Sequence, residues 1–187
     1  MGITRLSGLG RAAIRALPGA RSTISSAASG RVSTVLGTMS IPHQLDLEST
    51  SQALAAFKEA GHVEVDTALM YEGGRTEKAL GELGICKDGY FQLACKANPW
   101  FKDGRTHGNE PMGGLEGVRV KEQLHKSLES LGTSSVDLFY LHAPDYDTPL
   151  EETLQAVHEL RQEGLFKEWG VSNYSSWQTV HIWHICR

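Results

Sequence analysis

Short apolar runs typical of strands alternate with helix-like periods from about residue 32 onward. The strand-like runs are residues 32–37, 62–66, 91–97, 136–142 and 166–171. Between them apolar residues recur at helical spacing, and one such face consists of Val120, Leu124, Leu128 and Leu131. Five βα repeats in strict alternation predict an α/β protein with a parallel sheet and right-handed crossovers.

Turn and capping residues indicate where the helices end and begin. Gly61 and Gly164 follow apolar periods and are typical of helix stops. Residues 148–151, with the sequence TPLE, combine a capping box with proline at the first helical position, which predicts a helix start at Pro149. Residues 102–114 are polar and rich in glycine, so they predict a mobile surface loop where a substrate lid can lie.

Polar residues suited to one active site follow four of the strand-like runs. They are Asp66, Tyr71, Lys96, His142, Ser172 and Asn173. The C-terminal ends of parallel strands share one rim, so these groups should converge although they lie far apart in the sequence. This arrangement favours an enzyme.

The residue types at this rim suit a proton transfer coupled to hydride transfer. A buried Lys96 beside Asp66 keeps its positive charge, and we expect that charge to lower the pKa of the Tyr71 phenol from its usual value of about 10. Tyr71 would then give its proton to a carbonyl oxygen, which His142 would orient by a hydrogen bond. No side chain can supply a hydride, so a cofactor is required.

Several short segments together resemble the aldo-keto reductases. They are DTA at 66–68, YEGGRTE at 71–77, the strand around Lys96, DLFYLH at 137–142 and GVSNY at 170–174. Further detail, in GTM at 37–39, KANPW at 96–100 and LHAPD at 141–145, is similar to the aflatoxin B1 aldehyde and succinic semialdehyde reductase branch. The resemblance extends from about residue 32 to residue 185.

This resemblance implies a (β/α)₈ TIM-type barrel and NADPH-dependent reduction of aldehydes such as succinic semialdehyde or aflatoxin dialdehyde to alcohols. It assigns the catalytic roles to Asp66, Tyr71, Lys96 and His142. It assigns contacts with the nicotinamide amide of NADPH to Ser172 and Asn173. We expect Asp66 among the cofactor-binding residues too, and His142, Trp100 and Met39 among the substrate-binding ones, Trp100 because it follows Lys96 closely enough to line a substrate pocket. No metal is implied, and a homodimer is an expected assembly.

The chain is short for this fold, because a (β/α)₈ barrel needs roughly 250 residues and the sequence has 187. Only about the first five βα units are present, so the family's adenosine-phosphate segment is missing and NADPH affinity should be weakened. An unclosed sheet should expose an unpaired edge at the first and the fifth of these strands. Two alternatives therefore stay open: a regulatory module like the channel-associated β subunits that resemble this family, and an inactive partial product.

The first 45 residues contain five arginines and no acidic residue. We therefore divide the chain into a leader, residues 1–31, and a partial reductase domain, residues 32–187. Arginine, serine and alanine interspersed with isolated apolar residues are typical of a mitochondrial presequence, but a disordered leader has the same composition. The expected compartment is the cytoplasm or the mitochondrion.

Beyond residue 45 the chain carries 13 basic against 22 acidic residues, a net charge of −9. Such a body should repel nucleic acid and anionic membranes. No hydrophobic run approaches the roughly 18 residues that a membrane helix needs, so we expect a soluble protein whose partner is a small-molecule substrate. Three irregularly spaced cysteines argue against a disulfide framework and suit a reducing compartment.

Ordinary structural roles compete with some of these assignments. Asp66 and Lys96 taken alone suit a structural ion pair, and Tyr71 or His142 alone suits packing. The stretch GLGRAA at 8–13 matches a dinucleotide fingerprint, but no strand precedes it, so we treat it as a chance match. His181, His184 and Cys186 lack a second ligand pair at zinc spacing.

Overall fold

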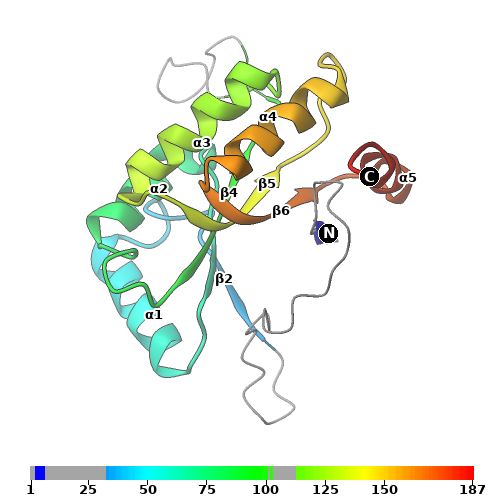
Figure 1. Ribbon diagram of the computed structural model, residues 1–187. Helices are drawn as coiled ribbons and strands as arrows, with labels where there is room; N and C mark the ends of the chain where they lie inside the picture. The colour runs from blue at the N-terminus through cyan, green and yellow to red at the C-terminus, as the bar shows by residue number, and fades with distance from the viewer. Residues whose placement is uncertain (1–2, 7–32, 101, 103–112) are drawn as a thin grey trace.

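A parallel sheet forms the centre of the molecule (Figure 1). The computed structural model describes residues 3–6, 33–100, 102 and 113–187. Five parallel strands follow the predicted runs: β2 Val35–Gly37, β3 Glu64–Asp66, β4 Gln92–Ala97, β5 Val136–Leu141 and β6 Phe166–Ser172. They pair in sequence order within a six-stranded sheet whose order is β1-β6-β5-β4-β3-β2. The predicted parallel α/β arrangement is confirmed.

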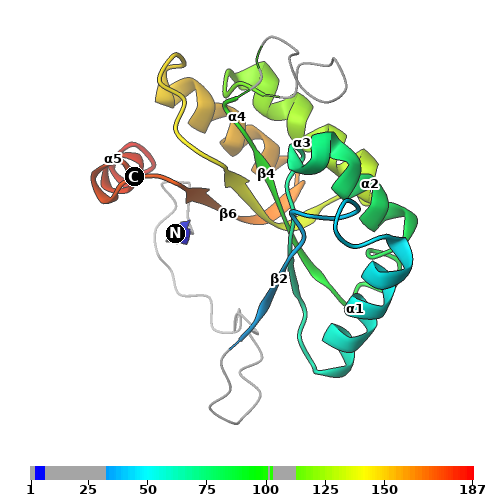
Figure 2. The same cartoon turned by 180° about the vertical axis from the view of Figure 1, so that it is seen from behind.

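Helices follow the parallel strands as predicted. They are α1 Leu47–Glu59, the short 3₁₀ helix η1 Tyr71–Gly74 with α2 Arg75–Glu82, α3 Gly117–Leu131, α4 Leu150–Gln162 and α5 Ser176–Ile185. Helices α2, α3 and α4 lie side by side along one side of the sheet, and α1 continues this layer past α2 (Figures 1 and 2). A curved parallel sheet with helices along one side is the wall of a (β/α) barrel.

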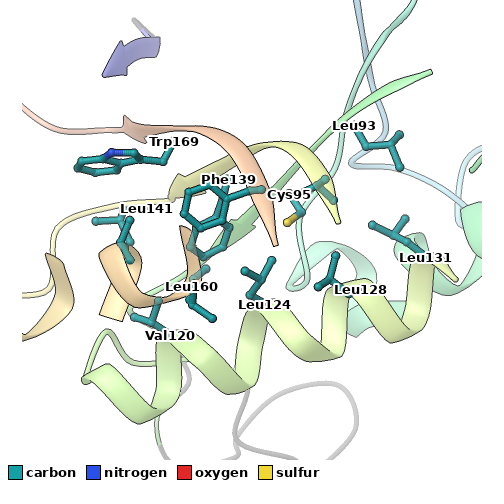
Figure 3. Packing of buried hydrophobic residues seen from close by; sticks show 14 of the residues in the cluster. Leu93, Cys95, Val120, Leu124, Leu128, Leu131, Phe139, Leu141, Leu160 and Trp169 are labelled. Carbon is teal, nitrogen blue, oxygen red and sulfur yellow. The ribbon is translucent and has the colours of Figure 1, made fainter. Parts of the chain in front are cut away.

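The main core lies between the sheet and this helical layer. The predicted face of α3 is buried, and Leu124 and Leu128 point toward Cys95 of β4 (Figure 3). Phe139 of β5 and Trp169 of β6 belong to the same cluster. Because side chains alternate along a strand, the residues of β4 next to Cys95 face the opposite side of the sheet, and Lys96 is one of them.

Leu124→Ala should destabilise the protein strongly, because Leu124 is fully buried in this core. Truncating a buried leucine removes apolar contacts and leaves a cavity, which costs about 2–5 kcal/mol in the free energy of unfolding. Urea denaturation would measure the change. Val118→Ala in the same helix is the control, since Val118 is 61% exposed and its truncation should change stability little.

The edge of β6 differs from the expectation of an unpaired strand. Strand β1, Ile3–Leu6, pairs with it antiparallel, with Ile3 opposite Ser172 and Leu6 opposite Trp169. The prediction of an open edge at the fifth βα strand is therefore wrong, because a segment within the predicted leader supplies the missing hydrogen-bonding partners. Of residues 1–31, only those of strand β1 are described, so the stretch 8–13 lies outside the described residues.

The start of α4 also differs from the predicted capping box. Pro149 is the N-cap, and no side chain caps the helix. The Thr148 hydroxyl instead donates to Asp145 Oδ2 at 2.9 Å, a partner in the preceding turn. Short polar side chains readily form such local bonds in competition with helix capping. The predicted loop at 102–114 falls mostly outside the described residues, which include only Lys102, Gly113 and Gly114 of it.

Candidate active site

Lys96 and Asp66 form a pair at the C-terminal ends of β4 and β3. The Lys96 ammonium donates to Asp66 Oδ2 at 2.7 Å and to the Thr67 carbonyl oxygen at 2.6 Å. The Lys96 side chain is only 4% exposed. Burial lowers the pKa of Lys96, and the charge of Asp66 opposes that effect. The predicted pair is present, and the structure adds the Thr67 carbonyl to it.

A turn with left-handed backbone holds Tyr71 beside this pair. Glu72, Gly73 and Gly74 have φ angles of 49°, 64° and 86°, and the two glycines adopt this region without the steric cost that a Cβ brings. The chain thereby turns from η1 into α2. The Lys96 ammonium lies over the Tyr71 ring, 5.1 Å from its centroid, which is a cation–π distance.

The pKa of Tyr71 moves in the direction opposite to the expected one. Burial of the phenol and, after it, the charge of Asp66 raise it to about 12. The expected lowering by Lys96 is therefore wrong: desolvation penalises the phenolate, and the carboxylate that neutralises Lys96 also repels it. At neutral pH Tyr71 keeps its proton.

His142 follows β5 on the same rim. Its ring packs edge-on against Tyr71, with 5.9 Å between centroids, and against Trp100, with 5.4 Å. Burial and the charge of Lys96 lower the pKa of His142 to about 4, so the imidazole is neutral at neutral pH. Its Nδ1 is enclosed and has no hydrogen-bond partner among the described residues.

Ser172 and Asn173 lie at the end of β6, next to His142. Asn173 Nδ2 donates to the His142 carbonyl oxygen at 2.7 Å and to Ser172 Oγ at 3.1 Å. Asn173 has a φ of 62°, a region that asparagine tolerates better than most residues. The amide therefore ties the ends of β5 and β6 together, while the Asn173 side chain remains exposed.

Trp100 and Met39 lie at the outer part of this rim. Trp100 reaches the group through its contact with His142. Met39 comes one residue after Thr38, whose hydroxyl donates to the Asp66 carbonyl oxygen at 2.9 Å, and its side chain is 67% exposed. The structure thus brings Trp100 into contact with the central residues and leaves Met39 on the surface beside them.

Three further residues support the site. Tyr140 lies under the Lys96 ammonium, with 5.8 Å between its ring centroid and Nζ. The period-2 pattern of β5 could have indicated this residue, since Tyr140 lies two residues before His142 and so faces the same side of the sheet. Gln123 of α3 accepts from the Asn98 backbone at 2.9 Å and holds the end of β4. Glu77, a residue of α2, is completely buried.

The described part of the chain offers neither a metal site nor a membrane-spanning helix. It holds no group of three or more histidine, cysteine or acidic side chains placed to bind a metal ion. None of its helices combines the length and the apolar composition that crossing a bilayer demands. His181 and His184 lie in α5, and Cys186 follows that helix.

The parallel strands, their outer helices and the polar rim define part of a (β/α)₈-type barrel. A model of the aldo/keto reductase family matches residues 34–184, and the chain belongs to that family. The resemblance predicted from the short motifs is confirmed.

Relatives in the aflatoxin aldehyde reductase branch are similar to this chain. This chain is 46% identical over 160 residues to human aflatoxin B1 aldehyde reductase member 2, and the match covers 84% of this chain and 42% of the relative. It is 43% identical over 184 residues to the rat protein of the same name, covering 95% of this chain and 47% of the relative. The chain therefore spans less than half the length of these curated relatives.

Solved structures agree with the fold. The glycerol dehydrogenase AKR11B4 from Gluconobacter oxydans superposes with a TM-score of 0.69 at 27% identity, covering 81% of this chain and 47% of that one. An aldo-keto reductase from Klebsiella pneumoniae in complex with NADPH superposes with a TM-score of 0.62 at 29% identity, and the match covers 80% of this chain and 49% of that one.

Proposed function

We propose that this chain carries the proton-donating part of an NADPH-dependent aldehyde reductase, which converts aldehydes to alcohols. The observation that supports this most is the convergence of a protonated phenol, a buried ammonium and a neutral imidazole on one rim. Each of the three has a role in adding a proton to a carbonyl oxygen.

Tyr71 is the proton donor in this proposal. Its phenol gives the proton to the carbonyl oxygen as the carbonyl carbon becomes a C–H centre, and a phenolate remains. Lys96, over the face of the ring, stabilises that phenolate, and Asp66 holds Lys96 in position. The neutral His142 ring donates a hydrogen bond to the same oxygen and orients the aldehyde.

NADPH, when bound, supplies the hydride. The described residues suit its nicotinamide end, because Ser172 and the exposed Asn173 place a hydroxyl and an amide side by side. These groups offer both a donor and an acceptor, which is what a carboxamide needs. Asp66 is the third residue predicted to bind the cofactor, and it contributes by keeping Lys96 in position.

The outer rim and the relatives named aflatoxin B1 aldehyde reductases support an aldehyde as the substrate class. Trp100 gives the rim an aromatic surface against His142, and the exposed Met39 adds an apolar one next to Thr38, which suits the carbon skeleton of an aldehyde. Succinic semialdehyde and aflatoxin dialdehyde are the proposed substrates. The test is NADPH oxidation, followed by absorbance, with succinic semialdehyde or 4-nitrobenzaldehyde. Absence of both turnover and NADPH binding in the folded chain would refute the proposal.

The second candidate is a regulatory module that acts by binding a channel-type partner, because channel-associated β subunits resemble the same family. Partner recovery in a pulldown, without turnover, would favour it. A cooperative thermal transition of the 187-residue chain would argue against an inactive partial product. The homodimer and the cytoplasmic or mitochondrial compartment stay predictions, to be checked by light scattering and by cell fractionation.

A further inference from the structure

Glu77 is an acidic side chain enclosed behind the proposed active site. It lies in the first turn of α2, two residues after the helix begins, and is 0% exposed. Neither of its carboxyl oxygens has a hydrogen-bond partner of ordinary geometry among the described residues. Enclosed polar groups nearly always have such partners, because losing water without replacement is costly, so this exception requires an explanation.

The backbone around Glu77 is fixed on both sides. The glycine turn at 73–74 leads into α2, and the Thr76 hydroxyl donates to the Ile41 carbonyl oxygen. Leu80, one helical turn further, is fully buried on the same side of the helix. The backbone of α2 therefore keeps the Glu77 side chain on the buried side of the helix.

Three neighbouring groups interact with Glu77. The Lys96 ammonium and the Ser127 hydroxyl of α3 both favour its ionised form, although no hydrogen bond of ordinary geometry joins Ser127 to it. The third neighbour is the Cys95 thiol of β4, whose ionisation Glu77 opposes. Asp66, facing Lys96 from β3, is the other carboxylate near this ammonium.

Burial is the largest influence on Glu77 and raises its pKa to about 7, with Ser127 and Lys96 acting in the other direction. The effect on Lys96 is reciprocal. The charge of Glu77 raises the pKa of Lys96, against the lowering that burial causes. Glu77 is therefore neutral below about pH 7, and above it is an anion whose charge favours the charged form of Lys96.

We propose that Glu77 is a positioning residue that acts on the reaction through Lys96. Asp66 contacts the Lys96 ammonium directly, and Glu77 adds the charge of a second carboxyl group from α2. When ionised, it keeps Lys96 charged and seated over the Tyr71 ring. Glu77 itself touches neither substrate nor cofactor. The catalytic part of this inference rests on the proposed function, whereas the coupling of Glu77 to Lys96 does not.

The coupling can be measured without turnover, by NMR of the chain labelled with ¹³Cε-lysine. In the wild type the Lys96 signal should show a secondary inflection near neutral pH, as Glu77 ionises. In Glu77→Gln this inflection should disappear, and Lys96 should lose its own proton at lower pH. Glu82→Gln, an exposed position of the same helix, is the control and should leave the Lys96 curve unchanged.

Turnover gives the second readout. At about pH 8, kcat of Glu77→Gln should fall about tenfold with KM unchanged, because Lys96 then lacks the anion that favours its charged form. At about pH 6 the two proteins should be equal, since the wild-type carboxyl is then neutral too. Glu77→Asp, which restores the charge, should recover part of the loss at high pH.

The outcomes separate this inference from the proposed function. Identical Lys96 curves in wild type and Glu77→Gln would overturn the inference even in an active reductase. Coupled curves in a chain without turnover would leave the coupling intact and count against the proposed function. If Glu77→Gln fails to fold, the wild-type Lys96 curve decides: a single inflection, with none near neutral pH, overturns the inference.

Discussion

Tyr71→Phe is expected to lower kcat for aldehyde reduction by about 10²–10⁴-fold, the range typical of losing a positioned general acid. Phenylalanine keeps the ring that packs against His142 and under Lys96, so NADPH affinity and the free energy of unfolding should change little. The loss should therefore appear in kcat, measured as NADPH oxidation with 4-nitrobenzaldehyde under saturating substrate.

The pH dependence of the wild type should agree with this role. A phenol with a pKa of about 12 stays protonated throughout the neutral range, so deprotonation of Tyr71 should cause no fall in rate between about pH 6 and pH 9. Tyr146→Phe is the matched control, because Tyr146 follows the same strand as His142 and is 84% exposed. Equal turnover in Tyr71→Phe and Tyr146→Phe would refute the assignment of Tyr71 as proton donor.

The parallel sheet could be predicted because its pattern is local. A strand buried on both sides reads as a nearly continuous apolar run, as in β5, and a helix against it shows an apolar face at 3.6-residue spacing, as in α3. The convergence of Lys96 and His142 then follows from topology alone, since neighbouring parallel strands place their C-terminal ends on one rim.

Features that depend on tertiary distances could not be predicted in the same way. The direction of the Tyr71 pKa shift depends on how deeply the phenol is buried and how closely Asp66 neutralises Lys96, and no spacing in the sequence gives either quantity. Strand β1 consists of residues 3–6, and four residues are too few to show a clear alternation. Its partner lies more than 160 positions away.

Glu77 is an intermediate case. An acidic residue in the first turn of a helix is usually a favourable, solvated partner of the helix dipole, which is the reading that its sequence position supports. Its spacing of three from Leu80 places it on the apolar face, and that signal could have shown that it is buried. That its charge acts on Lys96 could be learned only from the structure, in which α2, α3 and β4 share one core.

Lys96→Met is the second substitution expected to have a large effect. Methionine retains much of the apolar length of the side chain but removes the charge that stabilises the Tyr71 phenolate. Loss of one such preorganised electrostatic group lowers kcat by about 10²–10³-fold. The substitution should also reduce stability, because removing one partner of a buried ion pair costs about 3–5 kcal/mol. Asp66 is 21% exposed, so we expect the low end of that range.

A double-mutant cycle separates these two effects. Asp66→Asn combined with Lys96→Met leaves no unpaired charge, so the free energy of unfolding should recover much of the loss seen in Lys96→Met alone. Turnover should not recover, since the phenolate still lacks its cation. Urea denaturation and steady-state kinetics on the four proteins would measure both quantities. Recovery of activity together with stability in the double variant would mean that Lys96 serves only to hold the fold, and the electrostatic role proposed for it would be wrong.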